Sequence, residues 1–155
     1  MELIDGEKLS DLLNRGPLSP SRAVELAMEV TEGLSQAHEK GVVHRDLKPA
    51  NIMLNRRGEP ILMDFGVAKI LGETHYTATG TVIGTALYMS PEQARGERPD
   101  ERADIYSLGV TLFEMIAGRP PFEGDSAVAI LMKHVNEPVP AICEINSETD
   151  RKSVV

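Results

Sequence analysis

The sequence has little cysteine, no tryptophan and no excess of positive charge. Its 155 residues include one cysteine, Cys143, which excludes an internal disulfide and a cysteine cluster for metal and fits a reducing compartment. The formal net charge of −8 argues against a nucleic-acid partner. The 41% hydrophobic and 26% charged residues are typical of a folded chain of about one domain.

Long apolar runs are missing as well. The sequence contains no apolar stretch of about 18 residues, so no membrane-spanning helix is predicted. The first 15 residues carry acidic side chains early and lack an apolar signal core. We therefore expect a cytoplasmic location for this chain, which leaves open a membrane anchor in a longer parent protein.

The hydrophobic spacing predicts a mostly helical chain. Asp5-Gly6 indicates a turn before a short helical stretch at Leu9, Leu12 and Leu13. A long helix is predicted over 20–40, with Ser19 as its N-cap, Pro20 at its first position and Gly41 at its end. We expect the main apolar stripe of that helix to carry the following residues, with Ala23, Ala27, Val30 and Ala37 beside it: Val24, Met28, Thr31, Leu34 and His38.

The second half of the chain alternates between short and long elements. Residues 51–55 and 60–65 read as two strands joined by "RRGE", which is a hairpin signal. Residues 72–85 are rich in Gly and Thr and are predicted to form a long loop. Residues 101–117 predict a helix that is apolar on nearly all sides, and 126–136 a last helix capped by Asp125 or Ser126.

The stretch "HRDLKPAN", residues 44–51, carries the strongest chemical signal. Together with "DFG", residues 64–66, it supplies Asp46, Lys48, Asn51 and Asp64. A tight hairpin brings Asn51 and Asp64 to the same end, where a carboxylate and an amide oxygen suit Mg²⁺. Asp46 faces the same site as a base or orienter of a hydroxyl, and Lys48 supplies positive charge for a phosphoryl group. Each residue alone has a structural explanation, as a turn former, a helix cap or a surface pair; their order and combination favour chemistry.

These stretches resemble the signature set of protein kinases, in which a catalytic loop precedes a metal-binding loop. "GTALYMSPE", residues 84–92, is similar to the end of a kinase activation segment, with Ser90 where Ala is commoner. "DIYSLG", residues 104–109, is similar to the start of the central helix of the family, with Tyr106 where Trp is common. In sequence, these stretches are most similar to bacterial, eukaryote-like Ser/Thr kinases. Small-molecule phosphotransferases share a distant form of the first two stretches but lack the "SPE" segment.

The resemblance implies an ATP- and magnesium-dependent transfer of phosphate to Ser or Thr of protein substrates in signal transduction. By resemblance, Asp46 takes or orients the proton of the substrate hydroxyl, and Lys48 stabilises the transferred phosphoryl group. Asn51 and Asp64 bind the magnesium ions that bridge the ATP phosphates. Thr85 bonds near Asp46 and Lys48 and favours a hydroxyl substrate.

The resemblance also implies roles for residues outside the two loops. "MEL" is similar to the hinge between the kinase lobes, so Met1 and Leu3 meet the adenine. Leu9 and Met53 pack on the base, or else form plain core. Arg45, just before Asp46, receives a phosphate from the activation segment, with Thr77 and Thr79 as the preferred phosphorylation sites. Asp104 braces the catalytic loop, and Glu92 pairs in the family with an arginine from helices that are not among these residues.

The expected fold is mainly helical, α+β overall: a kinase-like C-terminal lobe with a small hairpin, truncated at both ends. Residues 1–137 are expected to form the hinge and most of that lobe, and 138–149 an irregular tail. Residues 150–155, "DRKSVV", back-translate to the start of a common sequencing adapter and are expected to be an artefact. The 155 residues include no Gly-rich phosphate loop and no strand lysine ahead of the catalytic loop. We therefore expect this chain alone to be inactive. The alternative is a non-catalytic, kinase-like binding or regulatory module.

Overall fold

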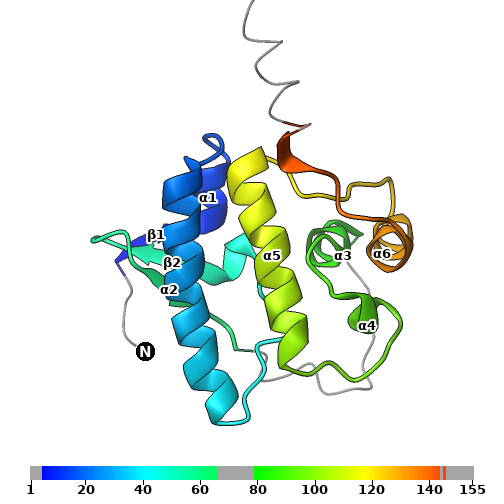
Figure 1. The fold of residues 1–155 in the computed structure, drawn as a ribbon, viewed down its shortest axis with the longest axis horizontal. Helices are drawn as coiled ribbons and strands as arrows, with labels where there is room; N and C mark the ends of the chain where they lie inside the picture. Colours follow the sequence, from blue (N-terminus) through cyan, green and yellow to red (C-terminus); the bar gives the residue numbers. More distant parts are fainter. Residues whose placement is uncertain (1–4, 66–78, 144, 146–155) are drawn as a thin grey trace, which may run out of the picture.

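A computed structural model describes residues 5–65, 79–143 and 145, with the backbone alone at 79–82. Helices dominate, and one small sheet accompanies them, as the sequence predicted. The two longest helices lie side by side, with the sheet on one side and three further helices on the other (Figure 1). The elements are β1 (Gly6–Lys8), α1 (Leu9–Leu13), α2 (Pro20–Glu39), the 3₁₀ turn η1 (Pro49–Asn51), β2 (Ile52–Asn55), β3 (Pro60–Leu62), α3 (Thr79–Ala86), α4 (Pro91–Ala94), α5 (Glu101–Ala117) and α6 (Ala127–Asn136).

The sheet contains the predicted hairpin and one strand more. β2 pairs antiparallel with β3, with Ile52 opposite Leu62. On the other edge of β2, β1 pairs antiparallel and places Gly6 opposite Asn55. The predicted turn at Asp5-Gly6 is therefore wrong. Gly6 lies so close to β2 that a Cβ on it would be 1.9 Å from the carbonyl oxygen of Leu54, and this close approach explains the glycine.

Helix α2 has the predicted ends but a different buried face. The Ser19 hydroxyl accepts the backbone N–H of Arg22, Pro20 is the first helical residue, and Gly41 follows the helix with a φ of 72°. The predicted apolar stripe is wrong, because Val24 and Met28 are 46% and 63% exposed. The buried residues are Ala23, Leu26, Ala27, Val30 and Leu34. Small alanines on this face let α2 pack closely against α5.

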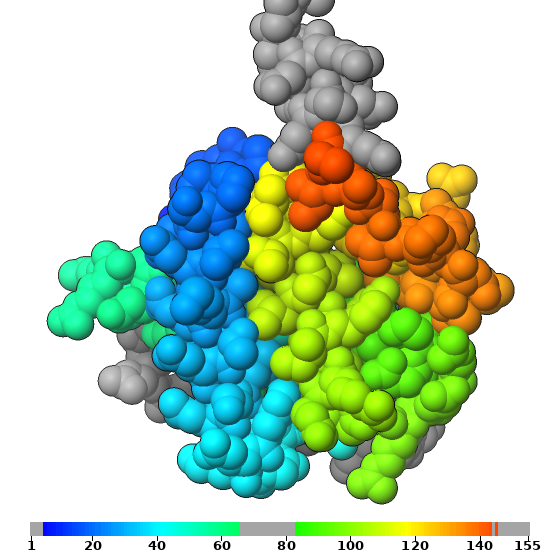
Figure 2. All heavy atoms as spheres, in the orientation of Figure 1, coloured from blue at the N-terminus to red at the C-terminus, as the bar shows by residue number. Residues whose placement is uncertain are grey.

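Helix α5 is the central element. It begins at an Asp100 cap and ends at Gly118, which has a φ of 76° that favours glycine. Its buried residues are Ala103, Asp104, Ser107, Leu108, Val110, Thr111, Phe113 and Met115. A helix that is apolar on nearly all sides is expected to be covered by other elements, and this expectation fails at Ile105, which is 52% exposed. On the face drawn in Figure 2, α5 is open to view between α2 and α6.

The remaining helices settle one alternative and correct one prediction. Ser126, and not Asp125, caps α6, because its hydroxyl accepts the backbone N–H of Ala129. The predicted loop over 72–85 is wrong from Thr79 onward, where α3 begins; residues 72–78 lie outside the described residues. Glycine and threonine disfavour this helix locally, and packing of α3 against α6 outweighs that preference. Within the described ranges, no helix is both long and apolar enough to cross a bilayer.

The core lies between α2, α5 and the sheet, and it includes one residue of the 44–51 loop. Leu47, in the middle of that loop, is 1% exposed and belongs to the same apolar cluster as Leu34, Ile52 and Met115. A leucine buried to this extent contributes about 2 kcal/mol by removal from water. The loop is therefore fixed to the core from within, while its polar side chains point to the other elements.

Two glycine substitutions test this fold. Gly6→Ala is expected to lower the free energy of unfolding by about 2 kcal/mol or more, because its Cβ would overlap the backbone of β2. Gly109→Ala is the matched control: it lies within α5, where an added Cβ would meet nothing within 4 Å, and alanine should add up to about 1 kcal/mol. Urea unfolding of both variants measures the difference, and equal midpoints would contradict the placement of β1.

Candidate functional site

The 44–51 loop is bound to α5 through one buried carboxylate. Asp104 is 1% exposed. Its Oδ2 accepts the backbone N–H of His44 at 2.8 Å, and its Oδ1 accepts that of Arg45 at 2.8 Å. The ring of His38, from α2, lies 2.7 Å from Oδ2 through Nε2. Hydrogen bonds to an ionised carboxylate are about twice as strong as neutral ones, so this contact fixes the start of the loop.

Arg45 has the backbone conformation that this contact requires. Its φ is 66°, which is uncommon for a residue with a side chain. From the far side, Gln93 donates its side-chain amide to the Arg45 carbonyl at 2.9 Å. Within the described part of the chain, the buried Nε of Arg45 has no hydrogen-bond partner. An unpaired buried donor costs about 1–3 kcal/mol, so this guanidinium is suited to an acceptor that comes from elsewhere.

His44 connects the loop to the end of the hairpin in one tautomer. Its Nε2 lies 2.9 Å from the Met63 carbonyl, which accepts only, so Nε2 carries the hydrogen. Its Nδ1 then accepts the backbone N–H of Asp46 at 3.3 Å. The ring also packs against Phe65, with 4.8 Å between ring centroids. The neutral ring thus joins Asp46 to the segment that leads to Asp64.

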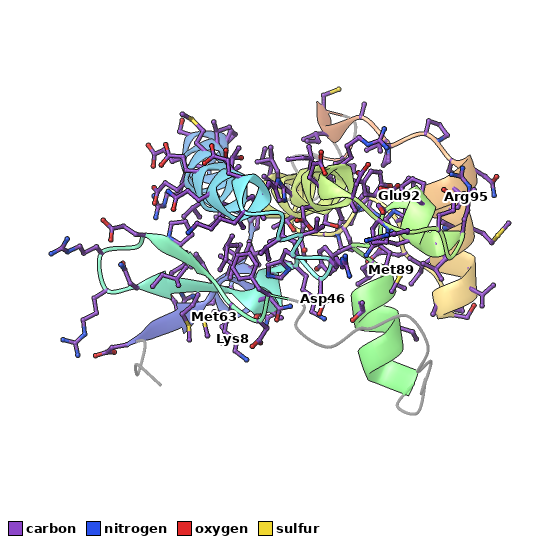
Figure 3. The ribbon with its side chains drawn as sticks, turned by 90° about the horizontal axis from the view of Figure 1, so that it is seen from below. Lys8, Asp46, Met63, Met89, Glu92 and Arg95 are labelled. Atoms are coloured by element: carbon purple, nitrogen blue, oxygen red, sulfur yellow. The ribbon has the colours of Figure 1, made fainter. Side chains whose placement is uncertain are left out.

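Four side chains of the predicted site meet at Asp46 and Lys48. The Lys48 ammonium lies 3.3 Å from Oδ1 of Asp46 and donates to Oγ1 of Thr85 at 2.9 Å. Asn51 donates through Nδ2 to Oδ2 and to the backbone carbonyl of Asp46. Figure 3 shows Asp46 between the sheet and the α3–α4 segment. The carboxylate is therefore oriented by an amide and a cation, and the cation also reaches the α3 side.

Asn51 and Asp64 lie at one end of the hairpin. The Asn51 carbonyl accepts the N–H of Met63 at 2.8 Å, which extends the strand pairing to the residue before Asp64. Asp64 is exposed, with a φ of 53°. Because Asn51 uses Nδ2 for both bonds to Asp46, its amide oxygen remains the ligand atom. The described residues hold no cluster of three His, Cys, Asp or Glu for a metal. The oxygens of Asn51 and Asp64 are ligands of the type that Mg²⁺ prefers, an ion that takes waters and phosphates as its other ligands.

A pocket of about 340 Å³ opens beside Lys48. Its lining includes Tyr88 and Glu114, and the Tyr88 hydroxyl donates to the Glu114 carboxylate at 2.5 Å. Burial raises the pKa of Glu114. Burial and the neighbouring Glu114 raise the pKa of Tyr88 well above its usual range, so the tyrosine stays protonated. The pocket therefore has a polar, partly buried wall next to Lys48.

The comparisons with known proteins agree with this arrangement. The profile of the protein kinase domain matches residues 1–154. The chain belongs to the protein kinase family. Among its relatives, the serine/threonine-protein kinase PknB of Mycolicibacterium smegmatis is 49% identical over 144 residues, which is 90% of this chain and 23% of that protein.

Two further relatives in the kinase family have similar identity. A probable serine/threonine-protein kinase of Streptomyces coelicolor is 49% identical over 140 residues, 88% of this chain and 21% of its own length. A probable PknB of Lactococcus lactis is 44% identical over 149 residues, 96% of this chain and 24% of its own length. The chain thus spans about a quarter of the length of these curated relatives.

Several residues expected to matter in a kinase lie elsewhere or outside the described ranges. Met1, Leu3 and Thr77 are outside the described residues, and only the backbone of Thr79 is described. Leu9 is 1% exposed within the core, which is the packing alternative for this residue. Met53 is half-buried on β2, opposite Lys8 and Ile61. Glu92 lies in the first turn of α4, and none of the described side chains forms an ion pair or hydrogen bond with its carboxylate.

The sequence did not predict the contacts of two residues of this site, His38 and Gln93. His38 was assigned to an apolar stripe, and nothing in the spacing of α2 indicates its contact with Asp104, 66 residues away. Gln93 had a readable signal, because Ser90 and Gln93 form a capping box at the start of α4. That signal predicts the local cap but not the bond to Arg45, 48 residues distant.

Replacing the central carboxylate tests the contact that fixes the loop. Asp104→Asn leaves one oxygen and adds an amide that faces N–H donors, so we expect a loss of about 2–4 kcal/mol in the free energy of unfolding. The exposed Asp125→Asn is the control and should change it by no more than about 0.5 kcal/mol. Denaturant titration followed by circular dichroism measures both. An Asp104→Asn midpoint within error of the unsubstituted chain would show that the three contacts carry no net stability.

Proposed function

We propose that this chain carries the catalytic loop of an ATP- and magnesium-dependent protein serine/threonine kinase. The observation that carries the proposal is the Lys48 ammonium, which lies 3.3 Å from Asp46 and 2.9 Å from Thr85. A carboxylate, a cation and a hydroxyl at these distances suit the positioning and charge stabilisation that phosphoryl transfer requires. The kinase names of the relatives support it.

In this proposal Asp46 accepts the proton of a substrate Ser or Thr hydroxyl as the hydroxyl oxygen bonds to the γ-phosphorus of ATP and the bond from that phosphorus to the departing ADP breaks. Asn51 holds one carboxylate oxygen of Asp46 at 3.2 Å, and Lys48 lies against the other. The carboxylate thus has a fixed direction before the substrate arrives. Pre-set orientation of this kind is what general-base catalysis needs.

The other residues position the phosphate and the substrate. Lys48 neutralises the transferred phosphoryl group, and Thr85 ties Lys48 to the segment that faces a hydroxyl substrate. Asn51 and Asp64 would hold magnesium, which would supply charge neutralisation for the phosphates of ATP. The amide oxygen of Asn51 and the exposed carboxylate of Asp64 are the atoms that would bind it.

The proposal assigns the catalytic half of a kinase domain to residues 1–137, with 138–149 as an irregular tail and 150–155 as an artefact. Met1, Leu3 and Met53 would meet the adenine. A glycine-rich loop and a strand lysine, which kinases use to hold ATP, do not precede the catalytic loop in these 155 residues. We therefore propose that the chain alone has negligible activity. A compartment that supplies ATP and keeps Cys143 reduced, the cytoplasm, suits the reaction.

A chimera tests the proposed function. This chain would replace the 144 matched residues of the Mycolicibacterium smegmatis relative, whose remaining sequence supplies the other parts. We expect transfer of labelled γ-phosphate to a protein substrate, and a loss of about 10³-fold in kcat for Asp46→Asn at an unchanged melting temperature. Asp125→Asn is the matched control with full activity.

Two outcomes of the chimera experiment would contradict the proposal. Equal activity of the Asp46→Asn chimera would remove Asp46 from the catalytic machinery. A chimera that melts cooperatively but transfers no phosphate would favour the alternative, a non-catalytic kinase-like module.

Phosphorylation just before α3 or at its first residue is a separate prediction. A phosphate on Thr77 or Thr79 would supply acceptors for the guanidinium of Arg45, whose buried Nε has no partner within the described residues. We expect mass spectrometry of the active chimera to find one of these two threonines phosphorylated. Replacing both by valine should lower activity, while the exposed Ser21→Ala should not. Active protein with neither threonine modified would contradict the assignment.

A further inference from the structure

A buried histidine on α6 lies where three elements meet. His134 is 4% exposed. Its Nε2 lies 3.1 Å from the carbonyl oxygen of Leu87, just after α3, and its Nδ1 lies 2.7 Å from the hydroxyl of Tyr106 on α5. Phe122, from the segment before α6, packs edge-on against the ring at 5.0 Å between centroids. The ring uses both nitrogens, and neither contact is local in sequence.

The two contacts determine the tautomer. A carbonyl oxygen only accepts, so Nε2 carries the hydrogen and donates to Leu87. In the neutral ring Nδ1 has no hydrogen and accepts from the Tyr106 hydroxyl. A proton added at Nδ1 would leave the Nε2–H bond to Leu87 in place and reverse the other bond, with Nδ1 donating to the Tyr106 oxygen. It would also place a charge on a ring that is 4% exposed and packed against Phe122. The cost of that buried charge favours neutral histidine and would move the ring out of this pocket in acid.

The Leu87 carbonyl belongs to a short segment that is bound on both sides. Two residues earlier, Thr85 accepts from Lys48 of the catalytic loop. One residue later, the Tyr88 carbonyl accepts from the Ser107 hydroxyl of α5 at 2.7 Å. Residues 85–88 therefore lie between the catalytic loop and α5–α6, and His134 supplies a hydrogen bond from α6 to this segment.

We propose that neutral His134 is a positioning residue for residues 85–88, and that its protonation in mild acid releases this segment from α6. Resting on the proposed function, the consequence is that Thr85 loses its fixed position relative to Lys48 as the pH falls. His134 touches no reacting atom in this scheme. It acts through the Leu87 carbonyl.

The charges around the ring give the direction of the pH effect. Burial lowers the pKa of His134, and this effect outweighs the carbonyls of Ala86 and Leu87, which raise it. Facing it is Tyr106 on α5, whose own pKa is raised by burial and by the charge of Glu92 on α4. Helix α4, which packs against α6, also carries Arg95 at its end, and α3 carries no titratable side chain. On the α6 side, Lys133 binds the Glu123 carbonyl, and Glu123 pairs with Arg119 at the surface.

The sign follows from the lowered pKa. The unfolded chain binds a proton at His134 at a higher pH than the folded chain does. Stability from this site is therefore complete above the ordinary histidine pKa of about 6.5 and is lost as the pH falls through the folded value. Local release of residues 85–88 is expected in the same range of pH.

Hydrogen exchange of the full chain, without nucleotide, tests the proposal. Exchange of peptides covering 84–90 would be followed by mass spectrometry between about pH 7.5 and about pH 5 and corrected for intrinsic rates. We expect protection in the unsubstituted chain to fall by about tenfold in acid, which corresponds to about 1.4 kcal/mol. His134→Gln, which can donate to Leu87 and accept from Tyr106 but does not titrate, should keep its protection.

The control and the contrary results are as follows. Val128→Gln, on the exposed side of α6 at 69% exposure, should lose protection in acid as the unsubstituted chain does. An acid-induced loss in His134→Gln equal to that of the unsubstituted chain, or no loss in the unsubstituted chain, would overturn the proposal. If His134→Gln does not fold, Tyr106→Phe decides: a transition at higher pH supports the role of Nδ1, and an unshifted one overturns it. No readout involves ATP, so a failed kinase assay leaves this result intact.

Discussion

The carboxylate of Asp104 is the contact on which the site depends. It is almost fully buried, and it accepts two consecutive backbone N–H groups of the loop and contacts an imidazole from α2. A buried ion costs several kcal/mol to desolvate, and only a complete set of partners offsets that cost. The three donors supply such a set. In return, the loop enters the site with Arg45 in a left-handed conformation that little else would enforce.

From that point the remaining contacts follow in sequence. His44 hydrogen-bonds both Met63 and Asp46. Asn51 orients the Asp46 carboxylate, and Lys48 connects that carboxylate to Thr85. Leu47 lies under the middle of the loop and attaches it to the core. The Asp46 and Lys48 side chains thus remain partly exposed, while apolar packing of Leu47 holds the backbone between them. This division explains how so many polar groups are tolerated in eight residues.

Local signals were enough to predict part of this structure. The Ser19 cap, the Gly41 and Gly118 ends and the hairpin at 52–62 depend on neighbours within a few residues, and the sequence shows them directly. The buried face of α2 does not, because alanines at Ala23 and Ala27 and larger residues at Val24 and Met28 fit two different stripes of similar hydrophobicity. β1 was hidden for a related reason: Gly6 reads as a turn former, and only the proximity of β2 shows that it serves a close approach. The residues of the site were apparent from their order, whereas the partners of Asp104 and Arg45 on α2 and α4 were not, since they are 48 to 66 residues apart along the chain.

Helix α5 sets the spacing between several contacts of the site. Asp104, Ser107 and Glu114 lie on one side of it and contact, in turn, the 44–51 loop, the Tyr88 carbonyl and the Tyr88 hydroxyl. Ten residues of helix separate the first from the last, about 15 Å at 1.5 Å per residue. A single residue inserted between them would turn one end by about 100° relative to the other and place the loop and the Tyr88 segment on different sides. The length of this helix is therefore as strict a requirement as any side chain, and variation in chain length is expected to fall in the segment between α5 and α6.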